Sequence, residues 1–144
     1  SVNAHANGSH NPCARFQKAI SRQAFLDAPM VSDPINLMDA SPIGDGAAAI
    51  ILTSQPIKRP FPQVFVAGSS SCTDTISVQT RKNSTFLTAA ANSAKLAYAQ
   101  AGIGPKDIGV FEYHDAFSIM AALSLEAADL RNPGRVRASR WTEK

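Results

Sequence analysis

A tight turn that opens directly onto an uncharged apolar run constrains this fold more than any other stretch. Residues 41–46 read Ser-Pro-Ile-Gly-Asp-Gly, and the run AAAIIL follows at residues 47–52. Glycine and aspartate tolerate the backbone angles that such turns require. A continuous apolar run of this length is typical of a strand that is covered on both faces. Further strands are expected at residues 63–67 and 108–113, which together with intervening helices predicts an α/β fold.

Two longer helices are expected beside these strands. Between residues 84 and 101, apolar side chains recur every three or four positions, and Gly102 stands where a helix commonly ends. Residues 119–130 are apolar on nearly every side, which predicts a helix buried between layers. Ser21 is expected to cap a short helix at residues 22–27. Helices this apolar need cover, so we expect packing against another chain or against more of a larger protein.

The chain is expected to divide into three parts. Residues 1–40 form a loop and linker region that is irregular over residues 1–12, residues 41–130 form the α/β unit, and residues 131–144 form an irregular basic tail. The tail holds five basic side chains and one acidic one, whereas the rest of the chain holds nine basic and ten acidic ones. Because the net charge of +3 thus belongs to a short end, nucleic-acid binding is not expected.

Composition argues against several other classes of protein. The longest apolar run has six residues, far short of the roughly 20 that span a membrane. No signal-peptide pattern is visible at the N-terminus. The two cysteines, Cys13 and Cys72, form no C-x-x-C motif, and the three histidines lack metal-ligand spacing. We therefore expect a cytoplasmic protein with two ordinary thiols and no metal site.

The pair His114-Asp115 is the sharpest chemical feature. It stands where a predicted strand ends and a predicted helix begins, and ligand sites of α/β sheets lie beyond the carboxyl ends of strands. A histidine there can donate a hydrogen bond to a developing oxyanion. The structural alternative is that Asp115 only caps the helix and His114 only packs.

Four stretches resemble, in the right order, thiolases of the sterol-carrier-protein-2 type. They are HANGSHNP (5–12), SPIGDGAAA (41–49), AYAQAGIGPKDIGVFEYHDAF (97–117) and YHDAFSIMAALSLEA (113–127). The resemblance runs from about Asn3 to about Leu130. It implies a partial thiolase-like layered αβαβα fold, comprising about one C-terminal-domain half and the loop region before it.

The resemblance also implies an activity. Thiolases are acyltransferases that act on acyl-CoA thioesters by Claisen condensation or thiolytic cleavage, with coenzyme A as cosubstrate and no covalently bound cofactor. His114 would help to form the oxyanion hole, Asp115 and Phe117 would shape the substrate site, and His5 would contact the ligand. The nucleophilic cysteine and the Gly-His-Pro base of the family have no counterpart in this sequence. The isolated chain is therefore expected to be inactive.

Partners and alternatives follow from the same resemblance. It implies acyl-CoA as ligand and either a homo-oligomer (usually a homodimer or tetramer) or packing against the missing thiolase half. It also implies a role in lipid metabolism and a cytoplasmic or, in a eukaryote, peroxisome-like location. One alternative is a thiolase-like retro-aldolase subunit that cleaves β-hydroxyacyl-CoA with an OB-fold partner protein, although those relatives tend to carry tyrosine at the position of His114. The other is a non-catalytic module that binds acyl-CoA or lipid.

Overall fold

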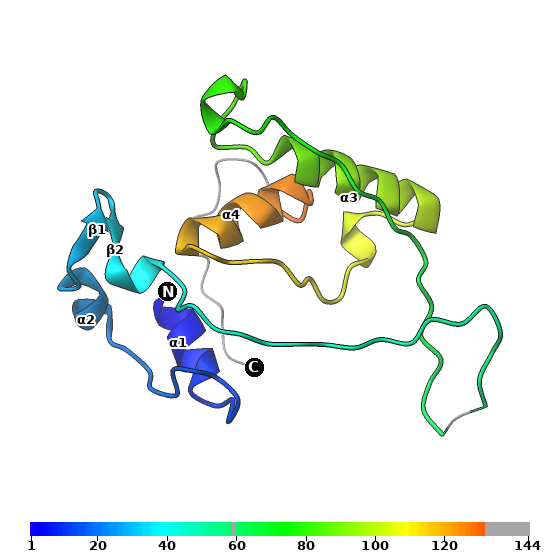
Figure 1. The fold of residues 1–144 in the computed structure, drawn as a ribbon, viewed down its shortest axis with the longest axis horizontal. Helices are drawn as coiled ribbons and strands as arrows, with labels where there is room; N and C mark the ends of the chain where they lie inside the picture. Colours follow the sequence, from blue (N-terminus) through cyan, green and yellow to red (C-terminus); the bar gives the residue numbers. More distant parts are fainter. Residues whose placement is uncertain (59, 132–144) are drawn as a thin grey trace.

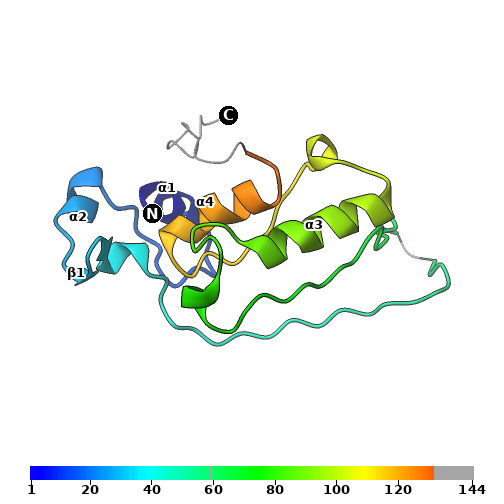
Figure 2. The ribbon, with the colours of Figure 1, turned by 90° about the horizontal axis from the view of Figure 1, so that it is seen from above.

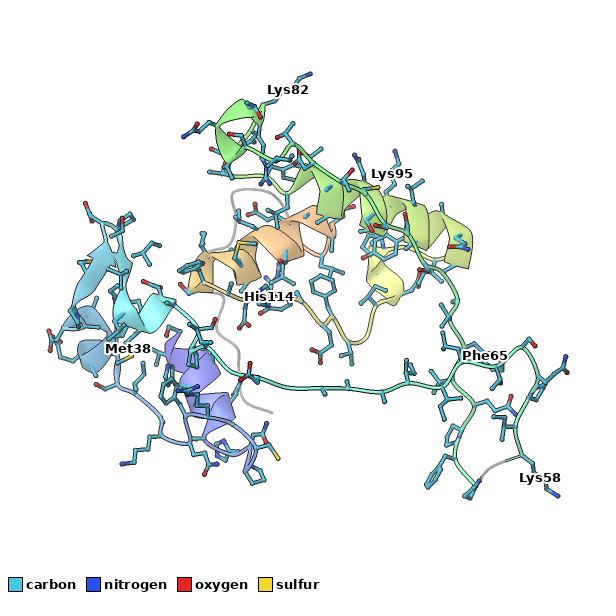
Figure 3. The ribbon with its side chains drawn as sticks, in the orientation of Figure 1. Met38, Lys58, Phe65, Lys82, Lys95 and His114 are labelled. Atoms are coloured by element: carbon cyan, nitrogen blue, oxygen red, sulfur yellow. The ribbon has the colours of Figure 1, made fainter. Side chains whose placement is uncertain are left out.

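Two packed helices form the centre of the protein. The computed structural model describes residues 1–58 and 60–131 (Figure 1). Helix α3 spans Thr88–Ala101, helix α4 spans Ser118–Ala127, and the two lie side by side (Figures 1 and 2). Lys95 lies on the side of α3 that faces away from α4 (Figure 3). Among the described residues, only Asn36, Ala127 and Ala128 are buried, each 4–5% exposed, so the core is small.

Helix α3 ends where the sequence predicts. Gly102 follows its last residue with φ 68°, a left-handed conformation that costs glycine little. The Gly102 N–H donates to the Ala99 carbonyl at 3.3 Å, and the Ile103 N–H donates to the Tyr98 carbonyl at 3.1 Å. These two bonds satisfy carbonyls that the helix end would otherwise leave unpaired. After α4 the left-handed residue is Asp129, with φ 56°, one position beyond the C-cap residue Ala128.

The two longer helices also differ from the sequence-based expectation. Helix α3 begins at Thr88, four positions after the expected start at Ser84. Helix α4 was expected to be buried between layers, but most of its residues are half-exposed and Ile119 is 51% exposed. The expectation of burial is wrong because the described residues cover this helix only in part.

The first forty residues form a cluster of short elements at one end of the molecule (Figure 1). In order they are α1 (Val2–Gly8), α2 (Arg22–Leu26), the antiparallel strands β1 (Met30–Ser32) and β2 (Ile35–Asn36), and the 3₁₀ helix η1 (Leu37–Asp39). The predicted cap of α2 is confirmed, since the Ser21 hydroxyl accepts from the Ala24 N–H at 3.0 Å. The prediction of an irregular start is wrong, because α1 occupies most of it.

The three expected strands at residues 47–52, 63–67 and 108–113 are not formed. Figure 1 shows the chain leaving the N-terminal cluster as one long extended segment and then turning back toward α3. Within the described part of the chain, β1 and β2 make up the only sheet. A strand needs a neighbour to pair its backbone N–H and C=O groups, and none of the described residues pairs with these runs as a strand. The apolar side chains of residues 47–52 and 63–67 stay in solvent, with Ile51 87% exposed and Val64 83% exposed, whereas Phe111 of the third run is half-buried.

Because Ile51 is exposed, shortening its side chain should have little effect on the stability of this chain. Replacing Ile51 by alanine should change the free energy of unfolding by less than about 0.5 kcal/mol, as is usual at exposed positions. The same change in a strand covered on both faces would cost about 2–5 kcal/mol. Urea denaturation followed by circular dichroism separates the two values. A loss of about 2 kcal/mol or more would mean that this run is covered in solution.

The returning segment is fixed against α3 at Gly68. The Ser69 N–H donates to Gln100 Oε1 at 2.7 Å, and the Ser93 hydroxyl donates to the Ser70 carbonyl at 2.8 Å. A Cβ atom placed on Gly68 would stand 2.4 Å from the Ala97 carbonyl oxygen. Glycine is therefore required by the close approach of two backbones. The chain then forms the 3₁₀ helix η2 (Val78–Thr80) before α3, and η3 (Pro105–Asp107) after it.

The division into three parts stays a prediction. The basic tail lies outside the described residues from residue 132 onward.

Candidate functional site

His114 and Asp115 lie on the extended segment that joins η3 to α4 (Figure 3). Both side chains are exposed, and neither makes a hydrogen bond or ion pair with another residue of the described ranges. Helix α4 has Phe117 at its N-cap position, with no side-chain cap. The structural alternative in which Asp115 serves as the cap of the helix is therefore wrong. His114 is likewise exposed and not a packed core residue.

Phe117 connects the candidate site to the N-terminal cluster. Its backbone pairs with that of Ala40 in an isolated antiparallel bridge, and its side chain is 44% exposed. Beside it, the Ser41 N–H donates to the Ala116 carbonyl at 3.0 Å. The start of α4 is thus held by Ala40 and by Ser41, the first residue of the Ser-Pro-Ile-Gly-Asp-Gly turn.

His5 lies in α1, and its ring stacks on the ring of Phe16. The two rings stack with their centroids 5.9 Å apart and their planes 20° from parallel. No hydrogen bond, ion pair or ring contact joins His5 to His114 in the described ranges. The structure therefore brings Phe117 to the N-terminal cluster but does not bring His5 into contact with the other predicted site residues.

A small groove lies between the two central helices and the segment that carries His114. It has a volume of about 280 Å³. Its lining residues are Ala90, Ser93, Ala94, Phe111, Tyr113, Ser124 and Ala128. Phe111 and Tyr113 stack at one side, with ring centroids 5.6 Å apart. Sequence reasoning had placed these two aromatic residues in a strand, where positions i and i+2 share one face, but it named no groove for them to line.

Tyr98 ties the two helices together at the end of α4. Its hydroxyl donates to the Ala128 carbonyl at 3.0 Å. Burial raises the pKa of the Tyr98 phenol, and the negative charge of Asp129 raises this pKa further. Both causes favour the neutral phenol in the folded protein.

The raised pKa sets the pH range in which this contact is lost. An unfolded tyrosine ionises near pH 10, so the contribution of Tyr98 is fully present below that pH and is lost as the pH rises through the higher pKa of the folded state. Tyr98→Phe should lower the free energy of unfolding at pH 7 by about 0.5–1.5 kcal/mol and remove this alkaline loss. Asp129→Asn should reduce the loss, because it removes the smaller cause. Urea denaturation from pH 7 to 11 measures both, and an identical alkaline profile for wild type and Tyr98→Phe would refute the assignment.

Other kinds of site find little support in the described part of the chain. Cys13 is exposed, Cys72 is half-buried, and both are free thiols in this structure. No group of three or more His, Cys, Asp or Glu side chains comes together there as a metal site would require. None of the described helices is both long enough and apolar enough to cross a membrane.

Comparison with known protein families identifies the family of this chain. The model of the family described as "Thiolase C-terminal domain-like" matches residues 70–141, which is half of the sequence. The chain belongs to the thiolase family. The predicted family is thereby confirmed, and the predicted α/β fold class with it.

Relatives over most of the chain agree with this placement. An acetyl-CoA acetyltransferase of Methanothermobacter thermautotrophicus is 38% identical over 128 residues, which cover 88% of this thiolase chain and 33% of that protein. A benzoylsuccinyl-CoA thiolase subunit of Thauera aromatica is 31% identical over 130 residues, which cover 86% of this chain and 33% of that protein. Human sterol carrier protein 2 is 28% identical over 138 residues, which cover 91% of this chain and 25% of that protein. The chain thus spans about a third of the length of the first two relatives.

Proposed function

We propose that this chain forms part of a thiolase-type acyltransferase that acts on acyl-CoA thioesters, with His114 as a hydrogen-bond donor in the oxyanion hole. The observation that carries the proposal is the placement of His114. It precedes α4 on a segment held by the Ala40–Phe117 bridge, and its ring has no partner in the described ranges. A histidine that served only packing would be covered or paired.

The chemistry of a Claisen condensation gives this position its role. The carbanion of one acyl-CoA attacks the thioester carbonyl of another acyl group, and the carbonyl oxygen gains negative charge. A neutral imidazole N–H aimed at this oxygen stabilises the charge, and it does so most where the charge is largest, in the transition state. Asp115 and Phe117 would border the same space, and His5 would reach it only by leaving Phe16.

The names of the relatives support the choice of substrate. One is called an acetyl-CoA acetyltransferase and another a benzoylsuccinyl-CoA thiolase subunit. Both names refer to a CoA thioester. We therefore propose coenzyme A as the cosubstrate and acetyl-CoA as the first acyl donor to test.

The exposed apolar runs support a packing partner. Ile50, Ile51 and Leu52 are all at least 70% exposed, and so is Phe65 at 76% (Figure 3). Soluble monomers rarely leave a continuous apolar surface of this kind uncovered. We propose that further thiolase polypeptide covers it, from the remainder of the same enzyme or from a second subunit.

A chimaera tests the proposed function. Residues 5–130 of this chain would replace the matching third of the Methanothermobacter relative, whose other two thirds supply the rest of the enzyme. The chimaera should convert two molecules of acetyl-CoA into acetoacetyl-CoA and free CoA, which a thiol reagent detects. A folded chimaera that binds acetyl-CoA but never releases CoA would contradict the proposal and favour the non-catalytic binding module.

A further inference from the structure

One carboxylate, that of Asp39, bridges two parts of the chain that lie far apart in the sequence. Its Oδ2 atom accepts from the Asn36 N–H at 3.1 Å, within the same 3₁₀ turn. Its Oδ1 atom accepts from the hydroxyl of Ser118, the first residue of α4. Asp39 and Ser118 are both half-buried. Each of the two carboxylate oxygens therefore accepts a hydrogen bond, and the two bonds fix the orientation of the side chain.

Asn36 anchors the other end of this link. It is only 5% exposed, and its side-chain amide donates to the Phe25 carbonyl at 3.0 Å. Its side-chain oxygen accepts from the Met38 N–H at 2.8 Å. A buried polar group that is hydrogen-bonded resists displacement, because each lost bond leaves an unsatisfied group. The turn that carries the Asp39 carboxylate is therefore held in place by the hydrogen bonds of Asn36.

The same carboxylate meets α4 where the helix lacks a cap of its own. Phe117 at the N-cap position supplies no side-chain hydrogen bond. A negative charge near a helix N-terminus is stabilised by the helix dipole. The Ala40–Phe117 bridge and the bond from the Ser41 N–H to the Ala116 carbonyl add two backbone links at the same place. Together these contacts fix the backbone from Ala116 to Ser118, and His114 stands two residues before it.

We propose that Asp39 is a positioning residue, which holds the start of α4 through Ser118 and thereby sets where His114 stands. The proposal rests on the proposed function, since it concerns how the oxyanion-hole histidine is placed. Asp39 does not touch the substrate in this account. It acts through the backbone that it fixes.

Variants of the intact chain test this role. Asp39→Ala and Ser118→Ala each remove one side of the same hydrogen bond, and Ser118→Thr keeps the hydroxyl. Asp45→Ala is the matched control, because Asp45 is exposed and lies on the same stretch of chain. The readouts are the ¹H–¹³C resonance of the His114 ring, the dissociation constant for acetyl-CoA, and the melting temperature.

We expect Asp39→Ala and Ser118→Ala to move the His114 resonance and to weaken acetyl-CoA binding, by up to about tenfold, as the loss of one charged hydrogen bond allows. The double variant should be no worse than the more severe single one, while Ser118→Thr and Asp45→Ala should resemble wild type.

A lower melting temperature with an unchanged His114 resonance and unchanged affinity would overturn the proposal. If Asp39→Ala does not fold, Ser118→Ala decides by the same readouts. If the wild type shows no affinity for acetyl-CoA, the proposed function fails, and the His114 resonance of the free variants still decides whether Asp39 positions the ring.

Discussion

Replacing His114 by alanine in the chimaera is expected to lower the rate constant for CoA release by about 10²–10³-fold, the usual cost of one oxyanion-hole donor. The donor is proposed to act on charge that develops in the transition state. The loss should therefore appear chiefly in kcat, and KM should rise by no more than about tenfold, the share that the hydrogen bond contributes to ground-state binding. His114→Asn keeps a side-chain N–H at this position and should retain more activity than His114→Ala.

His10 offers the matched control for this measurement. It is exposed, and the contact that its ring makes in the described ranges is with the Ala6 carbonyl, at 3.0 Å from Nδ1. His10→Ala should leave the rate of CoA release unchanged. Equal losses for His10→Ala and His114→Ala, or no loss for either, would remove His114 from the proposed mechanism.

Replacing Gly68 by alanine is expected to lower the free energy of unfolding by about 1–3 kcal/mol, the range typical of overpacking. The added methyl group would stand 2.4 Å from the Ala97 carbonyl oxygen and 3.3 Å from the Ala101 Cβ atom. Because the first of these is helix backbone, the returning segment must move instead. Its hydrogen bond from Ser69 to Gln100 would then be strained or lost.

Gly109→Ala is the control for Gly68→Ala. A Cβ atom at Gly109 meets nothing within 4 Å. Alanine there should be neutral or should raise the free energy of unfolding by up to about 1 kcal/mol, by restricting the unfolded chain. Urea denaturation of both variants measures the difference. If Gly68→Ala were as well tolerated as Gly109→Ala, the segment would not lie against α3 in solution.

The features that sequence predicts well here are set by neighbouring residues. The end of α3 at Gly102 and the cap of α2 at Ser21 depend on atoms within a few positions along the chain. Residue type and local backbone geometry decide both. Both predictions are confirmed at the residue named.

The features that sequence misses depend on distant contacts. Residues 47–52 have the composition of a covered strand, but a strand exists only where another strand pairs with it. Helix α1 has no apolar stripe, and it is held instead by a hydrogen bond from the Ser1 hydroxyl to the Met38 carbonyl. Neither partner can be read from the local pattern.

The candidate site shows the same division. His114 stands out because its motif resembles that of a family. Asp39 does not stand out, because its link to Ser118 crosses 79 positions of sequence. A local signal was present, since Asn36 and Asp39 have the three-residue spacing of a capping box. That spacing predicts the turn but not the helix that Asp39 holds.

The central claim is that His114 faces the carbonyl oxygen of a CoA thioester. The most direct measurement is the ¹³C resonance of acetyl-CoA labelled at its thioester carbonyl, recorded with and without this chain. A hydrogen bond to the oxygen should move the carbonyl resonance downfield with wild type and with His10→Ala, but not with His114→Ala. A resonance that does not move, or that moves equally with all three proteins, would contradict the account.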